Sequence, residues 1–387
     1  MAGSALQISA IIPAAGMSTR FDQYKPLLKL GSHTLIEKVI LLFRQSGIED
    51  IIVVTGHNNE MIEPLIRQSG AKAVLNPNFK TGMLSSIQTG VRALSPRRTG
   101  FFLLPADIPL IRPTTIHALM SSFDDVSDNL KTSGKIIMPQ FNGDNGHPPL
   151  IPARFIPEIL SLGTESNLGQ LLSGQKQKKI VQVHDRAILM DADTQADYEL
   201  LQEKYDKIDI PDRQECLSII NANLAGEDTI KAHLQLVAET SVRLAEAVEA
   251  NQAKQRQLRN MAIDLDINLI MAGALLHDIK RKEKNHAGAG AQLLLSLGFP
   301  KVADIVAQHM DLATPLPPHL TEVQLVYFAD KICRSDSIEL DYGRRFKEKM
   351  EKNPEGRSKI LRRYENTRHI QVRIETASGR SVQSILG

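Results

Sequence analysis

Cysteine is scarce in this sequence, and so is net charge. Cys216 and Cys333 are the only cysteines in 387 residues, which excludes a disulfide framework and indicates a reducing compartment. A formal net charge of +2 indicates no general affinity for nucleic acid or for an anionic membrane. No apolar run is long enough to span a bilayer, and residues 1–7 lack a basic segment followed by a long apolar stretch. We therefore expect a soluble, cytoplasmic protein with neither nucleic acid nor membrane among its partners.

Length and composition predict two domains. The sequence is 42% hydrophobic and 23% charged, as in ordinary globular proteins, and is long enough for two separate cores. In the first half, short β-rich runs alternate with helical stretches, which is the pattern of a mostly parallel, doubly wound (Rossmann-like) α/β sheet. The expected strands are 8–12, 51–55, 71–75, 100–105, 136–139 and 180–183.

The pattern changes after the polar run at 206–213, which we interpret as a linker. Helical periodicity then dominates, and we expect no strand. This division predicts an α/β domain at 1–205 and an all-α domain at 214–387. The expected helices are 228–252, 254–264, 267–280, 286–297, 300–310 and 321–335, followed by a basic tail. Since the aromatic residues of a nucleic-acid stacking surface are missing from this tail, we expect a solvated helical face with Arg344, Arg345, Lys347, Lys349, Arg362 and Arg363.

A loop of small residues follows the first expected strand. It consists of Pro13, Ala14, Ala15 and Gly16, whose small side chains let backbone N–H groups approach an anion. Arg20 and Lys25 lie just behind the loop and neutralise such an anion. The arrangement suits a triphosphate, although an ordinary strand-to-helix turn has the same pattern. A P-loop is excluded because its glycine-lysine spacing is absent.

Carboxylates stand at the ends of two other apolar runs. Asp107 follows the run at 101–104, at the sheet edge where ligands of open α/β folds bind, and is a candidate ligand for Mg²⁺. Asp191 and Asp193 follow the run at 188–190. Either carboxylate is a further candidate metal ligand, unless the segment simply caps a helix.

Two further segments are candidates for substrate contacts. The segment 82–90 combines a flexible turn with hydroxyl groups, so that Gly82 and Ser86 suit a base or a ribose, although a capped helix gives the same pattern. The second segment ends in Gly146, His147 and Pro148. It either closes over a second substrate or forms a turn.

Together these motifs resemble the molybdenum-cofactor nucleotidyltransferases, and among them the cytidylyltransferases and the related molybdenum hydroxylase accessory proteins. The matching segments, in order and spacing, are 13–21, 25–28, 53–56, 76–77, 82–86, 105–109, 146–148 and 191–194. The resemblance implies a MobA-like NTP transferase domain with Mg²⁺ as cofactor. It also places Gly56 in the nucleotide site and Gly146, His147 and Pro148 in the acceptor site.

The resemblance also indicates the substrates. Guanylyl-transferring relatives usually carry Ala-Gly-Gly in the first loop, whereas this chain carries Ala-Ala-Gly at 14–16, which favours CTP. The cytidylyltransferases carry a Gly-Asp-x-Gly-Ala-Arg segment for the acceptor. In the corresponding residues 163–170 of this chain, the acidic residue stands at a different position and the arginine is absent. The expected partners are CTP, a phosphorylated acceptor such as molybdopterin, and a molybdoenzyme client. The alternative acceptor is phosphocholine or a sugar phosphate.

The implied reaction is an in-line displacement. A terminal phosphate of the acceptor attacks the α-phosphorus of CTP and expels pyrophosphate, so positioning and charge neutralisation do most of the work. Arg20 and Lys25 hold the triphosphate and stabilise the departing pyrophosphate, while Asp107 binds Mg²⁺. No side-chain nucleophile is required.

A second set of ligand-type residues lies in the all-α half. They are His233, the consecutive pair His277 and Asp278, and Asp330, which fall on three separate expected helices, and the pair ends an apolar helix. Imidazole and carboxylate together suit a divalent metal ion, which lowers the pKa of bound water. The order of these residues resembles the HD phosphohydrolase superfamily over 214–387. The resemblance implies a hydrolytic site with Mn, Fe, Mg or Ni.

Two more histidines, His286 and His309, fall where multi-metal members of that superfamily place additional ligands. They bind either a second metal or a substrate phosphate. Lys280 either contacts phosphate or ends the helix in solvent. The leading hypothesis is therefore a bifunctional enzyme, a cytidylyltransferase fused to a phosphohydrolase. The alternative for the all-α domain is a regulatory module that binds a nucleotide without hydrolysing it.

Overall fold

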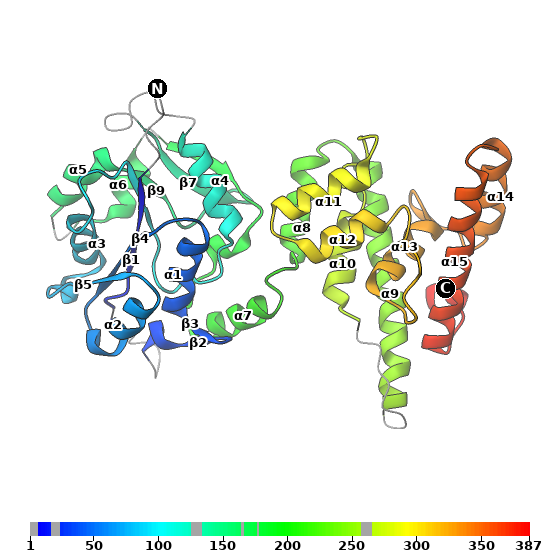
Figure 1. The fold of residues 1–387 in the computed structure, drawn as a ribbon, viewed down its shortest axis with the longest axis horizontal. Helices are drawn as coiled ribbons and strands as arrows, with labels where there is room; N and C mark the ends of the chain where they lie inside the picture. Colours follow the sequence, from blue (N-terminus) through cyan, green and yellow to red (C-terminus); the bar gives the residue numbers. More distant parts are fainter. Residues whose placement is uncertain (1–6, 17–23, 125–133, 164–165, 176–177, 257–264) are drawn as a thin grey trace. The chain divides into compact units, whose positions relative to one another are not determined.

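The structure is a computed structural model that describes residues 7–16, 24–124, 134–163, 166–175, 178–256 and 265–387. The chain divides into two compact units, Met1–Ile208 and Asp209–Gly387 (Figure 1). Arg20 of the predicted phosphate site lies outside the described residues, and so does most of the helix predicted at 254–264. In the described part of the chain, no helix has both the length and the apolar character needed to cross a bilayer.

A mixed eight-stranded sheet forms the centre of the first unit. Its strands follow the order β10-β7-β9-β6-β1-β4-β5, and β8 pairs with β7. They are β1 (Ile8–Pro13), β4 (Asp50–Thr55), β5 (Lys72–Leu75), β6 (Gly100–Leu103), β7 (Ile136–Phe141), β8 (Asp144–Asn145), β9 (Leu150–Pro152) and β10 (Lys178–Gln182). β1 runs parallel to its neighbours β4 and β6, whereas β9 runs antiparallel to β6 and β7. The predicted doubly wound α/β fold is confirmed, although the short strands β8 and β9 were not predicted.

Helices cover both faces of this sheet (Figure 1). Because successive side chains of a strand point to opposite faces, β1 contributes to two cores. Ile12 packs in a core with Leu35 of α1 and Ile116 of α4, and Ile11 packs on the other face with Ile87 of α3. The helices are α1 (Leu35–Gln45), α2 (Asn59–Gln68), α3 (Met83–Arg92), α4 (Pro113–Asp124), α5 (Ile156–Ser161), α6 (Leu168–Gly174) and α7 (Gln195–Asp206). Short connecting elements are η1 (Lys25–Leu27), β2 (Lys29–Leu30), β3 (His33–Thr34), η2 (Phe79–Thr81), η3 (Ala153–Phe155) and η4 (Arg186–Leu189).

The carboxyl ends of β1 and β6 lie next to each other. Ile11 is paired with Leu103 in the parallel ladder, so the segments that follow both strands emerge at one edge of the sheet. The backbone N–H of Ala106 donates to the carbonyl of Pro13 at 3.3 Å and ties the two segments together. This pairing brings the small-residue loop and Asp107 to the edge where open α/β sheets bind ligands.

The second unit is built from helices around a central apolar one, α10 (Ile267–Leu276), which is buried throughout 272–276. α10 contacts α9, α12 and α13. Its end at Leu276 leaves His277 as the first residue beyond the helix, whereas the prediction extended this helix to residue 280. The other helices are α8 (Arg213–Asn223), α9 (Asp228–Arg256), α11 (His286–Ser296), α12 (Pro300–Gln308), α13 (Glu322–Ile332), α14 (Tyr342–Lys352), α15 (Arg357–Ser378) and α16 (Val382–Leu386).

One small hairpin interrupts the helices. β11 (Cys333–Arg334) pairs antiparallel with β12 (Ser337–Ile338), so the expectation of no strand in this half was wrong at one place. Ser335 turns the chain with a positive φ of 52°. A strand of two residues is too short to show the alternation of apolar and polar residues by which a strand is recognised in a sequence.

Candidate functional site

A cavity of about 430 Å³ opens in the first unit at the sheet edge described above. Phe79 and Lys80 line it as well, although the sequence motifs did not single them out, and so does Met83 of the motif at 82–86. Their position around Gly82, in the connection from η2 to α3, is the signal that points to them. The predicted residues that the structure brings together in its lining are Pro13, Ala14, Ala15, Gly16, Lys25, Gly82, Ser86, Asp107 and Asp193.

The small-residue loop is held by hydrogen bonds from both sides. Ala14 donates its N–H to the carbonyl of Val54 at 2.8 Å, and the Tyr24 hydroxyl donates to the carbonyl of Ala14 at 3.0 Å. Gly56 lies beneath the loop, where a Cβ would come within 2.8 Å of the Cβ of Ala15. Gly56 therefore supports the loop by close packing and is not itself part of the cavity lining. Its assignment to the nucleotide site stays a prediction.

The hydroxyl group of Ser86 is fixed at the other side of the cavity. The buried side chain of Asn76 donates to Ser86 Oγ at 3.0 Å and to Ser85 Oγ at 2.8 Å. Gly82 precedes α3 with a φ of +108°, a conformation that side chains rarely adopt. The segment is thus both a helix start and a cavity wall, so the two sequence interpretations are compatible.

Lys25 joins two of the predicted metal-ligand carboxylates. Its ammonium lies 2.9 Å from Oδ2 of Asp107 and 3.0 Å from Oδ1 of Asp193. The N–H of Ala192 donates to the backbone carbonyl of Asp107 at 3.0 Å, which anchors the segment around Asp193 at the end of β6. Although burial opposes it, pairing with Asp107 and Asp193 raises the pKa of Lys25. The lysine is therefore firmly cationic at this position.

Asp191 lies close to this group but outside the cavity lining. Partial burial raises the pKa of Asp191, and repulsion from Asp193 and Asp107 adds to the shift. An all-oxygen set is the type that Mg²⁺ prefers, but these three carboxylates are not among the groups of described residues whose ligand atoms all lie within 4.8 Å of one another. The oxygen ligands fit the chemistry of Mg²⁺, and the assignment of Asp107, Asp191 and Asp193 as its ligands stays a prediction.

The predicted acceptor motif is packed behind the cavity. A Cβ on Gly146 would lie 2.5 Å from the carbonyl oxygen of Ile188, and the His147 N–H donates to that same oxygen at 2.9 Å. The peptide bond between His147 and Pro148 is cis. Burial lowers the pKa of His147, so its imidazole is neutral, and its Nδ1 has no hydrogen-bond partner among the described residues. None of the three motif residues lines the cavity, and their acceptor role stays a prediction.

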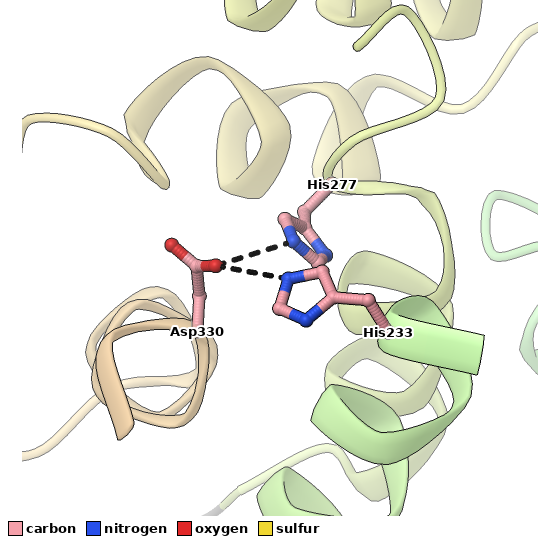
Figure 2. Close-up of side chains that lie close together, drawn as sticks. All are labelled: His233, His277 and Asp330. Carbon is pink, nitrogen blue, oxygen red and sulfur yellow. Dashed lines mark hydrogen bonds and ion pairs between the residues drawn. The ribbon is translucent and has the colours of Figure 1, made fainter. Parts of the chain in front are cut away.

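In the second unit, three helices bring the predicted HD ligands together (Figure 2). His233 comes from α9, His277 directly follows α10, and Asp330 comes from α13. Oδ1 of Asp330 lies 3.3 Å from Nε2 of His233 and 3.5 Å from Nε2 of His277. Such a set of nitrogen and oxygen atoms is the type that binds a divalent transition metal.

A second group of possible metal ligands, Asp278, His286 and His309, lies next to the first. Oδ1 of Asp278 lies 3.2 Å from Nε2 of His286 and 3.3 Å from Nε2 of His309. The two histidine Nε2 atoms are 3.2 Å apart. Because Asp278 follows His277 in the chain, all six predicted ligands gather in one place. Whether the second group holds a metal or a phosphate stays a prediction.

Backbone carbonyls set the orientation of two of these histidines. Nδ1 of His277 lies 2.7 Å from the carbonyl of Ala274, and Nδ1 of His309 lies 2.7 Å from the carbonyl of Val306. A carbonyl only accepts, so each Nδ1 carries a hydrogen and each ring is turned with its Nε2 toward the carboxylates. Nε2 of His277 is buried with no hydrogen-bond partner among the described residues. This orphaned donor atom fits a metal ion.

Both carboxylates of the HD group are ionised. Burial opposes ionisation of Asp278, but its hydrogen bond with His309 holds the pKa of Asp278 below the usual range. For Asp330, burial is outweighed by Lys331, which lies 2.5 Å away, and the pKa of Asp330 is well below the usual range. Anionic ligands at this position add to the attraction for a divalent cation.

A cavity of about 340 Å³ is lined by His233, Asp278 and Asp330 of the HD ligands, and the basic tail contributes to it. Arg345, Lys349 and Arg363 line this cavity, so the prediction of a solvated face was wrong for the half-buried Arg345 and Arg363, whereas Lys349 is exposed as predicted. Lys280 lies instead 3.6 Å from Glu283 and does not line the cavity, whereas the neighbouring Arg281 does. The spacing of Arg345 and Lys349 by four residues is a signal that places both on one helix face.

Comparison with known proteins assigns both units. A family model for the MobA-like NTP transferase domain matches residues 10–182, and one for the HD domain matches residues 230–335. The chain is 30% identical over 203 residues to the molybdenum cofactor cytidylyltransferase of Escherichia coli (strain K12), which covers 52% of this chain and 98% of that relative. The chain belongs to the MobA-like NTP transferase family. It is a nucleotidyltransferase that also carries an HD domain.

Other relatives match the first unit more locally. The chain is 32% identical over 111 residues to the 3-deoxy-manno-octulosonate cytidylyltransferase of Rickettsia canadensis (strain McKiel), which covers 28% of this chain and 44% of that relative. Among solved structures, a nucleotidyl transferase from Methanothermobacter thermautotroptrophicus matches with a TM-score of 0.45 and 21% identity. That match covers 52% of this chain and 98% of the other.

Proposed function

We propose that the first unit transfers the cytidylyl group of CTP to molybdopterin and releases pyrophosphate. The observation that carries this proposal is the shared cavity lined by the small-residue loop, Lys25, Asp107 and Asp193. The similarity to a molybdenum cofactor cytidylyltransferase over nearly its whole length supports the choice of nucleotide and acceptor.

The residues of this chain supply positioning and charge. The loop at 14–16 lines the cavity, where the N–H groups of Ala15 and Gly16 would donate to phosphate, and Lys25 brings a positive charge to the same lining. The acceptor phosphate oxygen forms a bond to the α-phosphorus of CTP while the bond to pyrophosphate breaks. Asp107, with Asp193 and Asp191 nearby, would hold Mg²⁺, which neutralises charge on the phosphates.

A second acceptor class is favoured by one observation. Residues 163–170 lack the arginine that the cytidylyltransferases carry at the acceptor segment. Phosphocholine or a sugar phosphate is therefore the alternative. The deciding experiment measures pyrophosphate release from each of the four NTPs, with molybdopterin, phosphocholine or a sugar phosphate as acceptor. Release that requires CTP and molybdopterin supports the first proposal, and release with phosphocholine or the sugar phosphate alone supports the alternative.

We further propose that the second unit is a metal-dependent phosphohydrolase. The observation that carries this proposal is the orphaned Nε2 of His277 beside ionised Asp278 and Asp330. His233, His277, Asp278 and Asp330 would hold a divalent ion, which supplies a nucleophilic hydroxide near neutral pH. Lys331 and Arg281 line the same cavity, and each is paired with a ligand carboxylate.

The test loads the full chain with Mn²⁺ and measures phosphate release from p-nitrophenyl phosphate and from nucleotides. Metal-dependent release that His277→Ala abolishes supports hydrolysis. Tight nucleotide binding without release, under the same conditions, supports the regulatory alternative.

A further inference from the structure

One wall of the HD cavity carries positive charge from three residues, two of which lie outside the matched HD region. Arg334 of β11 and Arg345 and Lys349 of α14 line the cavity, and we call these three residues the cationic wall. The HD match ends at residue 335, so Arg345 and Lys349 belong to a helix that this chain adds beyond it. The wall and the HD ligands share a single cavity.

The charge of Arg345 is only partly compensated. Its side chain is 16% exposed, and its Nε atom is buried with no hydrogen-bond partner among the described residues. The nearest carboxylate contact runs from Nη1 to Oε2 of Glu339 at 3.7 Å, which is too long for a hydrogen bond. A buried guanidinium donor in this position favours an anionic oxygen from outside the chain.

Lys349 lies one turn further along α14, on the same face as Arg345. Partial burial lowers the pKa of Lys349, and repulsion from Arg345 and Lys331 lowers it further. Among the described residues, no carboxylate pairs with this ammonium. Like charges held together in this way are relieved when an anion binds between them.

The remaining cations of the cavity are already paired. Arg281 lies 3.3 Å from Asp278, Lys331 lies 2.5 Å from Asp330, and Arg363 forms a two-pronged pair with Asp311 at 2.7 Å. The cationic wall is thus the part of the lining with positive charge left for a substrate. Ile230, Phe346 and Ile360 add apolar surface to the same cavity.

We propose that the HD site takes an organic phosphate ester with at least two phosphate groups. One phosphate lies at the HD ligands, a neighbouring phosphate binds the cationic wall, and the organic part contacts the apolar surface. The proposal rests on the proposed phosphohydrolase function and adds its substrate class. Hydrolysis forms a bond from water oxygen to phosphorus and breaks the phosphorus–oxygen bond to the leaving group, which takes up a proton.

The test uses the full chain loaded with Mn²⁺ and compares hydrolysis of CMP and CDP. Arg345→Gln and Lys349→Gln are expected to raise KM for CDP about tenfold and to change KM for CMP less than about twofold, since one charge-assisted contact to the second phosphate is lost. Arg345→Lys restores part of the CDP affinity. Arg344→Gln is the matched control, because Arg344 is on the same helix but its side chain is 72% exposed.

An equal change for CMP and CDP, or no change for either, overturns the proposal. If the wild-type chain hydrolyses neither CMP nor CDP, the proposed hydrolase function is wrong. The proposed substrate class is then tested by a binding measurement. Calorimetric titration with inorganic pyrophosphate must then give weaker binding for Lys349→Gln than for wild type and Arg344→Gln. Equal pyrophosphate binding in all three proteins overturns the proposal as well.

Discussion

In the first unit, Nζ of Lys25 lies 2.9 Å from Oδ2 of Asp107, although 82 positions separate the two residues in the sequence. The pair links the segment after the small-residue loop to the end of β6. It closes one side of the cavity in which we propose nucleotide transfer. The same lysine contacts Asp193, so three separate segments meet at one ammonium group.

Removal of the Asp107 charge is expected to stop nucleotide transfer. Asp107→Asn keeps the shape of the side chain but loses the negative charge, so pyrophosphate release from CTP should fall by about 100-fold or more. The protein should stay folded, because the side chain is 23% exposed. Asp144→Asn, an exposed position on β8, is the matched control. Turnover near the wild-type rate in Asp107→Asn would remove this residue from the site.

Ala15→Gly should weaken the expected preference for CTP over GTP. The Ala15 methyl packs toward Gly56 beneath the loop, so its loss lets the loop move and widens the base site. Selectivity that depends on one methyl group is modest, and the change should stay below about 100-fold. Competition between equal concentrations of CTP and GTP measures it. A preference for GTP in the wild-type protein would contradict the prediction.

His277→Ala and Asp278→Ala should each lose bound metal. Both residues are buried at the point where the two ligand groups meet. Metal content after loading with Mn²⁺ and desalting, measured by mass spectrometry, should drop in both variants. His319→Ala, at an exposed histidine of the same unit, should keep its metal. Cytidylyl transfer should remain near wild type, and a loss as large as that of Asp107→Asn would show that the two sites depend on each other.

A fragment of residues 209–387 should fold alone. This unit has its own apolar core, built around α10, and the boundary at Ile208 falls between α7 and α8. Circular dichroism should show a helical spectrum and a cooperative thermal transition, and the fragment should bind Mn²⁺. An unfolded fragment, or a folded one without metal under any condition, would argue against two independent domains at the predicted boundary of 206–213.

Gly146→Ala should destabilise the first unit by about 1–3 kcal/mol, since the added Cβ meets a backbone oxygen that has little freedom to move. The affected contact is with the carbonyl of Ile188, at 2.5 Å. Urea unfolding provides the free energy. Gly163→Ala is the control, because a Cβ there meets nothing within 4 Å. Equal stability of the two variants would show that the segment around η4 adjusts freely.

Local residue order was sufficient for the fold class and for naming most of the candidate ligands. Apolar runs and their periodicity predict the parallel strands and the helices, because burial of a strand or helix face follows directly from side-chain pattern. The motifs that led to Asp107, His277 and Asp330 are likewise local, since a carboxylate or imidazole after an apolar segment needs no partner to be noticed.

Only the tertiary structure shows which residues from distant segments contact each other. The sequence does not show that Lys25 contacts Asp193 or that Arg345 lines the HD cavity, because these contacts arise from the packing of elements far apart in the chain. The basic tail resembles a solvated helix in its sequence, yet α14 turns Arg345 and Lys349 into the cavity and leaves Arg344 in solvent. Which face of a charged helix is covered depends on its neighbours in space, and so tertiary packing decides where the positive charge is available for a substrate.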